Sequence, residues 1–135
     1  MSAEVTANTT TILIVDDNAD VRSLVGLILA RRGYRTVESG SARDALSRAR
    51  HWSPKIDVLL TDYALPDGDG ITLARRFLAR FPSAGVVFMS GFLEIPRWQL
   101  DNLDARWAFV PKPFRPRKLL ETVEAVLKER ETRAA

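Results

Sequence analysis

The chain has the length and composition of a single folded domain. Its 135 residues are 46% hydrophobic and 27% charged, proportions typical of a soluble globular protein and unlike those of disordered or fibrous chains. No apolar run approaches the roughly 20 residues of a membrane helix, and the absence of cysteine excludes disulfides and thiolate metal sites. Cytoplasmic localisation is the default expectation, and no contact with a membrane is expected.

The positive charge is spread along the chain. The formal net charge of +3 and the pI near 9.7 come from arginines in several segments, without one dense basic run. This spread is more typical of solvated helix faces than of a nucleic-acid or acidic-partner surface. Because no DNA-reading helix is recognisable either, we expect no direct contact with nucleic acid.

Strand and helix patterns alternate from residue 11 onward. The apolar run 11–15 predicts a buried strand, and a helix follows with Asp20 as a candidate cap and Gly33 as its stop. Residues 34–38 alternate weakly and predict an edge strand. The expected buried side of the first helix consists of Val21, Leu24, Val25 and Ile28.

The middle of the chain continues the alternation. Ser41, with Asp44 three residues later, resembles a capping box that opens a second helix. Residues 56–61 predict a buried strand. The turn cluster 66–70 then leads into a third helix that ends at Pro82.

The last third of the chain holds the least regular segment. Residues 85–89 and 107–110 predict two further strands, but residues 94–105 between them are irregular, because Pro96 is tolerated only in the first turn of a helix. Pro116 opens a final helix, and a charged tail is expected after it. The buried side of that helix is expected to be Leu119, Leu120, Val123, Val126 and Leu127.

Five strand–helix units of this kind predict an α/β fold. The sheet is expected to be mainly parallel and doubly wound, with right-handed crossovers and helices on both faces. The nearly continuous apolar strands agree, since parallel strands are buried on both sides.

Five polar side chains follow directly after apolar runs. They are Asp16, Asp17, Asp62, Ser90 and Lys112. The carboxyl ends of parallel strands line one edge of such a sheet, where ligands bind. We therefore expect three carboxylates, a hydroxyl and an ammonium group to converge on one pocket.

The three acids predict a divalent cation. Two carboxylates about 4 Å apart repel each other by roughly 4 kcal/mol at an effective dielectric constant of 20. Oxygen ligands without His or Cys favour Mg²⁺ or Mn²⁺ over zinc, and Mg²⁺ commonly binds phosphate as well. In that chemistry Asp62 is the candidate nucleophile, Asp16 and Asp17 hold the metal, and Ser90 and Lys112 contact phosphoryl oxygens.

Four motifs resemble one known family. They are I-L-I-V-D-D (12–17), D-V-L-L-T-D-Y-A-L-P-D-G-D-G (57–70), G-V-V-F-M-S-G (85–91) and F-V-P-K-P-F (109–114). In this order and spacing the chain resembles the receiver domain of two-component response regulators over residues 11–130. The resemblance implies a flavodoxin-like sheet with strand order 2-1-3-4-5. Residues 1–10 are then a flexible lead and residues 131–135 a tail, with no output domain attached.

The resemblance also implies roles for single residues. Asp62 is the implied phosphoacceptor and a metal ligand, Asp17 a direct Mg²⁺ ligand, Asp16 a ligand largely through water, and the Ala64 backbone carbonyl a third ligand. Ser90 is the implied switch hydroxyl and Phe109 the implied switch aromatic. Lys112 is the implied phosphate-pairing lysine, and the peptide bond before Pro113 is expected to be cis.

The implied partners are a histidine kinase or phosphotransfer protein and an unidentified downstream protein. Candidate contacts on the output face are Trp98, Trp107, Arg115 and Lys118, although Trp98 as an ordinary core residue remains equally open. Output through onward phosphotransfer, through a phosphorylation-dependent dimer, or within a larger protein also remains open. The S-G-F stretch at 90–92 is similar to that of receivers fused to hybrid kinases.

Some residues depart from the family pattern, and others have ordinary explanations. Ala64 and Phe92, which lie two residues after Asp62 and Ser90, lead to the hypothesis of a long-lived phosphorylated form. Asp67 and Asp69 are interpreted as turn residues, and the single histidine, His51, as a surface residue.

Two other functional classes remain as alternatives. A phosphohydrolase of the haloacid dehalogenase type would need a second acid at position 64, where the chain has alanine. A pseudo-receiver would bind partners without carrying phosphate, but such proteins usually lack an acid or the lysine. We expect a signalling domain that promotes only its own phosphorylation and dephosphorylation, not an enzyme acting on other substrates.

Overall fold

A computed structural model of the chain describes residues 9–90 and 95–134. Its main sheet has five parallel strands in the order β2-β1-β3-β6-β7. In chain order these are β1 (Thr11–Val15), β2 (Arg35–Ser39), β3 (Val58–Asp62), β6 (Gly85–Ser90) and β7 (Trp107–Pro111). Counted along the main sheet alone, this is the expected order 2-1-3-4-5, which confirms the doubly wound fold.

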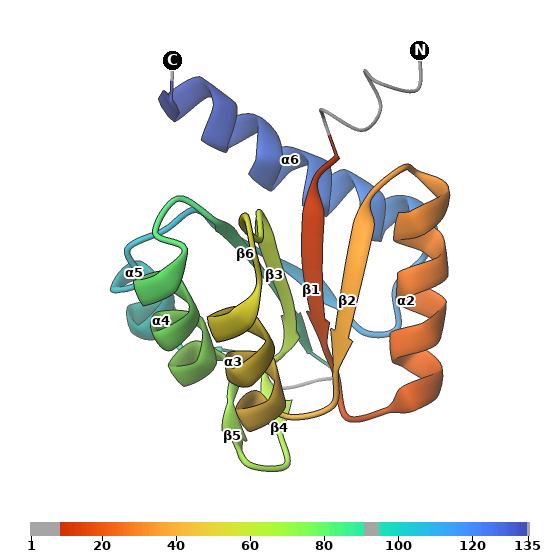
Figure 1. Ribbon diagram of the computed structural model, residues 1–135, viewed down its shortest axis with the longest axis horizontal. Coiled ribbons are helices and arrows are strands. Elements are labelled where there is room, and N and C mark those ends of the chain that lie inside the picture. Colours follow the sequence, from red (N-terminus) through yellow and green to blue (C-terminus); the bar gives the residue numbers. More distant parts are fainter. Residues whose placement is uncertain (1–8, 91–94, 135) are drawn as a thin grey trace.

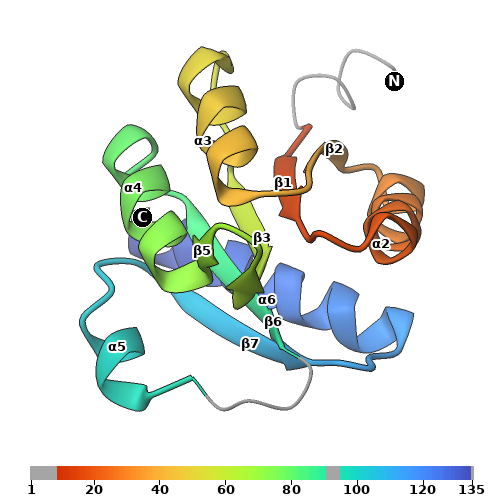
Figure 2. The ribbon, with the colours of Figure 1, turned by 90° about the horizontal axis from the view of Figure 1, so that it is seen from below.

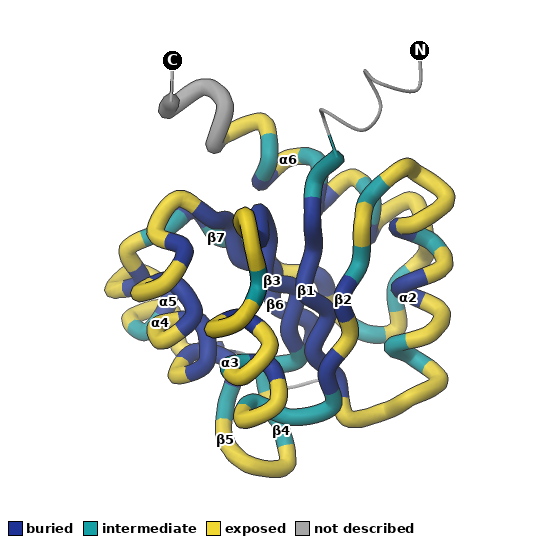
Figure 3. The backbone as a smooth tube through the Cα atoms, viewed as in Figure 1, coloured by how far each residue is buried: buried dark blue, intermediate teal, exposed yellow. Residues whose placement is uncertain are grey.

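Helices cover both faces of the sheet (Figures 1 and 2). On one face lie α2 (Ala19–Arg31) and α6 (Pro116–Ala134), and on the other lie α3 (Ala42–His51), α4 (Gly70–Arg80) and α5 (Arg97–Asp101). Successive residues of each strand point to opposite faces, so Leu13 joins the core under α3 and α4 while Ile12 joins the core under α2 and α6. The central strands β1, β3 and β6 are accordingly buried, except for the partly buried Asp62 at the end of β3 (Figure 3).

The N-cap and the buried side of helix α2 differ from the expectation. Its N-cap is Asn18, whose side chain accepts the amides of Asp20 and Val21, so Asp20 lies in the first turn and is not the cap. Leu24, expected on the buried side, is 56% exposed, while Leu29 is fully buried. The buried stripe follows Val25 and Leu29, four residues apart, and Leu24 lies about 100° around the helix from Val25.

The expected turn cluster contains a short antiparallel hairpin of β4 (Ala64–Leu65) and β5 (Gly68–Asp69). Two of its acids cap helices. Asp69 accepts the Thr72 amide at the start of α4, at 2.8 Å. Asp67 accepts two amides at the start of α3, whose own cap is Ser41 as expected. Both carboxylates therefore accept backbone amides at the starts of helices, which agrees with their interpretation as turn residues.

The last third of the chain clarifies two expectations. Pro96 precedes the short α5, and Trp98 on that helix is 64% exposed, so it is not a core residue. Helix α6 continues to Ala134, beyond Leu127, where only a charged tail was expected. Within the described part of the chain, no helix has both the length and the apolarity needed to cross a membrane.

Candidate functional site

The sheet register brings the polar strand ends together. Val15 lies beside Thr61 in the β1–β3 pairing, so Asp16 and Asp62 follow on adjacent strands. Backbone hydrogen bonds continue the pairing past the strand ends. The Tyr63 amide donates to the Met89 carbonyl at 2.9 Å, and the Lys112 amide donates to the Ser90 carbonyl at 2.6 Å. These bonds hold the loops after β3, β6 and β7 side by side.

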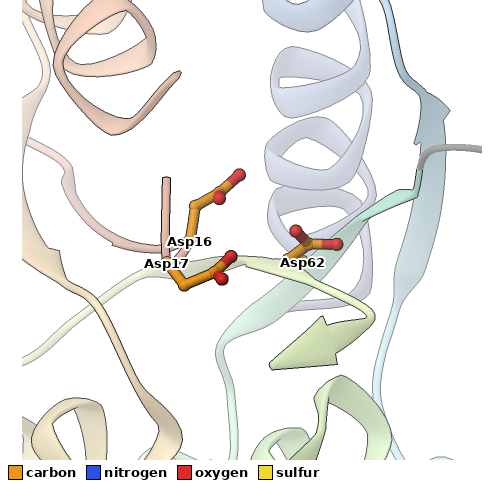
Figure 4. Close-up of side chains that lie close together, drawn as sticks. All are labelled: Asp16, Asp17 and Asp62. Atoms are coloured by element: carbon orange, nitrogen blue, oxygen red, sulfur yellow. The ribbon is translucent and has the colours of Figure 1, made fainter. Parts of the chain in front are cut away.

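Three carboxylates meet at this edge. One oxygen each from Asp16, Asp17 and Asp62 lie within 4.8 Å of one another, and Figure 4 shows the three side chains around a common space. Asp16 is fully buried, Asp17 is exposed, and Asp62 is partly buried. The acids expected to cluster from their positions after strands therefore do so.

Lys112 bridges two of these acids. Its Nζ lies 2.6 Å from Oδ2 of Asp16 and 3.0 Å from Oδ2 of Asp62. Charge-assisted hydrogen bonds of this kind are stronger than neutral ones, and the low exposure of all three side chains limits screening by solvent. The ammonium group thus offsets part of the repulsion among the carboxylates.

Burial and these partners shift two ionisations in the site. Burial raises the pKa of Asp62 above its ordinary value, although the hydrogen bond from Lys112 opposes the rise. The Asp16 carboxylate raises the pKa of Asp62 further. Burial alone would lower the pKa of Lys112, but its hydrogen bonds to Asp16 and Asp62 outweigh burial and raise it. Lys112 is therefore a firmly protonated cation beside a carboxylate that is reluctant to ionise.

Both carboxylate oxygens and the backbone carbonyl of Asp16 accept hydrogen bonds. Its Oδ1 accepts the Asn18 amide at 2.9 Å while its Oδ2 faces Lys112. Its backbone carbonyl accepts a hydrogen bond from Arg22 at 2.7 Å, and the same guanidinium lies 3.5 Å from Glu38 of β2. Sequence reasoning did not identify Arg22, because its pairing with Glu38 depends on how α2 and β2 sit around the end of β1. It also missed Asn18, although the Asn18 amide bonds an acid only two residues away and its side chain caps α2, which are local signals of a helix start.

Gly70 fixes the loop that carries Asp62. Its amide donates to the Tyr63 carbonyl at 2.6 Å, and a Cβ at this position would lie 2.6 Å from the Asp62 carbonyl oxygen. Only glycine permits so close an approach between backbones. The first turn of α4 therefore packs directly beneath the Asp62 loop.

The other expected site residues lie on β6 and β7 or just after them. Ser90 is buried at the end of β6, and Phe109 on β7 is 37% exposed. The peptide bond between Lys112 and Pro113 is cis, as the resemblance implied. Phe92, the basis of the shielding hypothesis, lies outside the described residues.

The expected output face spans α5, β7 and the start of α6. The Arg97 guanidinium lies 5.5 Å from the ring centroid of Trp107, so α5 contacts β7 through this pair. Arg115 and Lys118 are exposed near the beginning of α6. Trp98 and these two cations leave apolar and positive surface available to a partner.

The donor set fits a hard divalent cation. It offers carboxylate oxygens without His or Cys, which suits Mg²⁺ or Mn²⁺. The Asp17 side chain makes no hydrogen bond or ion pair with any other residue the structure describes, and it stands exposed at the mouth of the cluster. Its carboxylate is therefore available as a ligand.

The fold and the site together define a doubly wound α/β domain with an acidic, lysine-bridged pocket at the carboxyl ends of its strands. The model of a protein family, the response regulator receiver domain, matches residues 12–124. The chain therefore belongs to the receiver domains of two-component response regulators, which confirms the resemblance.

Relatives of different size match the same region. The chain is 31% identical over 121 residues to the sensor kinase CckA of Brucella abortus (strain 2308), covering 90% of this chain but 13% of CckA. It is 28% identical over 116 residues to the response regulator receiver protein CpdR of the same organism, covering 86% of this chain and 95% of CpdR. The chain thus spans a small part of one relative and nearly all of another.

Solved structures agree with this assignment. A CheY-like receiver domain protein from Methanospirillum hungatei JF-1 superposes with a TM-score of 0.84 at 27% identity, covering 93% of this chain and 99% of that one. The receiver domain of the hybrid histidine kinase CckA gives a TM-score of 0.73 at 32% identity, covering 87% and 98%.

Proposed function

We propose that Asp62 accepts a phosphoryl group from the phosphohistidine of a histidine kinase or phosphotransfer protein, in a Mg²⁺-dependent reaction in the cytoplasm. One observation carries the proposal. The partly buried Asp62 carboxylate lies within 4.8 Å of carboxylate oxygens of Asp16 and Asp17 and 3.0 Å from the Lys112 ammonium group. In this proposal the domain acts on its own Asp62 and turns over no other substrate.

The transfer exchanges one bond for another. An Asp62 carboxylate oxygen attacks phosphorus, the new P–O bond forms, and the P–N bond to the donor imidazole breaks with its electron pair returning to nitrogen. Lys112 then pairs with a phosphoryl oxygen, and the Ser90 hydroxyl donates a hydrogen bond to another. These contacts offset negative charge that would otherwise build up beside Asp16.

Two carboxylates and one carbonyl are the proposed direct metal ligands. They belong to Asp17, Asp62 and the Ala64 backbone. Both carboxylate oxygens of Asp16 already accept hydrogen bonds, from Asn18 and Lys112, which supports a role for Asp16 through water. When bound, Mg²⁺ supplies positive charge to the transferring phosphoryl oxygens.

The signal is proposed to leave the site through Ser90 and Phe109. When Ser90 moves toward the phosphoryl group, Phe109 turns inward from its present position at 37% exposure. The output face formed by Trp98, Trp107, Arg115 and Lys118 then repacks for a downstream protein. Phosphorylation biases a two-state equilibrium by binding one state better than the other.

The phosphodonor protein is proposed to dock on α2. Leu24 and Leu27 on this helix are 56% and 50% exposed, although leucines of this size are usually buried. The helix begins two residues after Asp17, so a protein bound along it would reach the acidic pocket. An exposed apolar pair beside a reactive site favours protein contact over solvation.

Intact-mass measurement tests the phosphoacceptor directly. Wild-type protein incubated with Mg²⁺ and a small acyl phosphate should gain the mass of one phosphoryl group, and a chelator should prevent the gain. Asp62→Asn should gain nothing, while Asp101→Asn, which changes an exposed acid on α5, should behave as wild type. A failure of wild type to gain mass under conditions that label a control receiver would favour the pseudo-receiver.

A further inference from the structure

Helices α3 and α4 lie side by side on the face of the sheet opposite α2 and α6 (Figures 1 and 2). Two hollows of about 740 and 400 Å³ adjoin along this pair of helices. Leu46, Arg50 and Arg76 line both hollows, which makes them one continuous feature. We call it the α3–α4 groove. Asp62 and Lys112 are not among its lining residues, so it is separate from the acidic pocket.

The α3–α4 groove is bordered by arginines. Arg43, Arg50, Arg76 and Arg80 are exposed along it. Arg50 and Arg76 make no hydrogen bond or ion pair with any residue that the structure describes. Arg80 donates to the carbonyls of Ala49 and Trp52 at the end of α3, at 3.4 and 3.2 Å. The charges of Arg50 and Arg76 are therefore not paired with acids of the described residues.

The acids at one end of the α3–α4 groove already have partners. Asp67 accepts the amides of Ala42 and Arg43, each at 2.9 Å, and Asp69 accepts the Thr72 amide at 2.8 Å. These hydrogen bonds hold their carboxylates at the starts of two helices. The groove is thus acidic at its hairpin end and basic along the remainder.

We propose that the α3–α4 groove binds an acidic amphipathic helix of a partner protein. Leu46 and the alkyl stems of Arg50 and Arg76 provide an apolar floor, and the guanidinium groups match carboxylates in a bidentate geometry. A helix of ten residues such as α3 is about 15 Å long, enough to seat two to three turns of a partner helix by the usual helix-in-groove arrangement.

A uniformly charged polyanion fits the α3–α4 groove less well. A nucleic-acid backbone would place phosphates against Asp67 and Asp69 at the hairpin end and would leave Leu46 without an apolar partner. An amphipathic helix instead covers Leu46 with its apolar side and directs carboxylates toward Arg50 and Arg76. The mixed character of the groove therefore favours the helix.

Peptide display with matched charge reversals tests this proposal. A library of 16-residue peptides has apolar residues at helical spacing on one side and random acidic, basic or neutral residues elsewhere. It is selected in parallel against wild type, the double variant Arg50→Glu/Arg76→Glu, and Arg75→Glu. Arg75 is exposed on the same helix as Arg76 but lines a different hollow, so its variant controls for charge on α4.

Wild type and Arg75→Glu should enrich acidic peptides that bind with the same affinity within about twofold. The double variant should bind those peptides at least tenfold more weakly while keeping the wild-type circular dichroism spectrum. Selected peptides should shift the amide resonances of Leu46 and Thr72. Asp62→Asn should bind them as wild type does, which distinguishes this surface from the phosphoacceptor site.

Other results would overturn the proposal. One is the absence of peptides whose binding depends on Arg50 and Arg76. A second is enrichment of basic or neutral peptides. A third is tighter binding of a 16-nucleotide single-stranded RNA than of any selected peptide, with the same loss in the double variant, which would assign the groove to nucleic acid.

Discussion

Lys112 is the residue on which the electrostatics of the pocket depend. Its ammonium group contacts Asp16 and Asp62 at once, so it holds together two carboxylates that would otherwise repel each other. A phosphoryl group on Asp62 would compete with both carboxylates for the same cation. The lysine is therefore a partner of the acids in one state and of the phosphate in the other.

Replacing Lys112 by methionine should raise the pKa of Asp62 further. Burial and the Asp16 charge already raise that pKa, and Lys112 opposes them more strongly than the Ala64 backbone hydrogen bond does. The side-chain carboxyl carbon resonance of Asp62, followed by NMR against pH in metal-free protein, should give a higher midpoint in Lys112→Met. Lys118→Met, at an exposed lysine of α6, should leave the midpoint unchanged. A lower midpoint in Lys112→Met would contradict this account.

Replacement by alanine should lower the stability of the fold at Gly70 but not at Gly26. A Cβ at Gly70 would meet the Asp62 carbonyl oxygen at 2.6 Å, whereas a Cβ at Gly26 would meet the mobile end of the Glu38 side chain at 2.9 Å. We expect Gly70→Ala to lower the free energy of unfolding by about 2 kcal/mol through overpacking. Gly26→Ala should be neutral or stabilising, because alanine is the better helix former. Urea unfolding of both variants measures the difference.

Single residues also mark what sequence could and could not predict. Asp16, Asp17, Asp62, Ser90 and Lys112 were predictable, since each follows an apolar run and parallel strands end at a common edge. Arg22 was not, because its contact with the Asp16 carbonyl joins segments that are placed only by packing. Residue type and local spacing carry no signal for such a contact.

Helix α2 illustrates the same limit for a whole element. Its existence follows from apolar spacing, but its rotation was predicted wrongly at Leu24, which is exposed. The apolar stripe of this helix is wide, and only packing against β1 and α6 decides which part of it is buried. The part left outside is the proposed docking surface for the phosphodonor.

Charge substitutions on α2 should separate two phosphodonors. The double variant Leu24→Glu/Leu27→Glu should slow transfer from a phosphorylated histidine-containing protein at least tenfold, because it destroys the apolar contact. Phosphorylation by a small acyl phosphate should change less than twofold, since the pocket itself is untouched. Ala79→Glu, at an exposed alanine of α4, should leave both rates unchanged. Equal slowing with both donors would argue against docking on α2.

Across the whole domain, the fold class follows from the alternation of strand and helix signals, whereas the strand order was implied by the resemblance to receiver domains. The hairpin of β4 and β5 was not predicted, because its four residues are too few to show a period of two. The length of α6 was also underestimated, since its final turns are charged and lack an apolar stripe. Short or uniformly polar elements are the ones that periodicity misses.

Metal binding should stabilise the entire domain. At a Mg²⁺ concentration tenfold above Kd, mass action adds about 1.4 kcal/mol of stability, which corresponds to an increase in Tm of about 5 °C for a domain of this size. Differential scanning fluorimetry with and without Mg²⁺ measures the increase.

The variant Asp62→Asn should have a higher Tm than wild type without metal and a smaller increase in Tm with Mg²⁺. Because the pKa of Asp62 is raised in the folded state, ionised Asp62 destabilises the metal-free fold at neutral pH. Its removal should therefore raise Tm in the absence of metal and reduce the increase caused by Mg²⁺. The idea fails if the variant melts below wild type without metal and still gains the full increase with it.

The bond between the hairpin and α3 gives this domain a built-in reporter. The amides of Ala42 and Arg43 both donate to Asp67, which lies five residues beyond Asp62 in the chain. The hydrogen bond from the Arg43 amide lowers the pKa of Asp67 most, and that from the Ala42 amide lowers it as well. The Asp67 carboxylate therefore keeps both hydrogen bonds at neutral pH and loses their stabilising effect in acid, as the pH falls through that lowered pKa. The amide resonances of Ala42 and Arg43 should therefore change when the loop after Asp62 moves and the hydrogen bonds to Asp67 break.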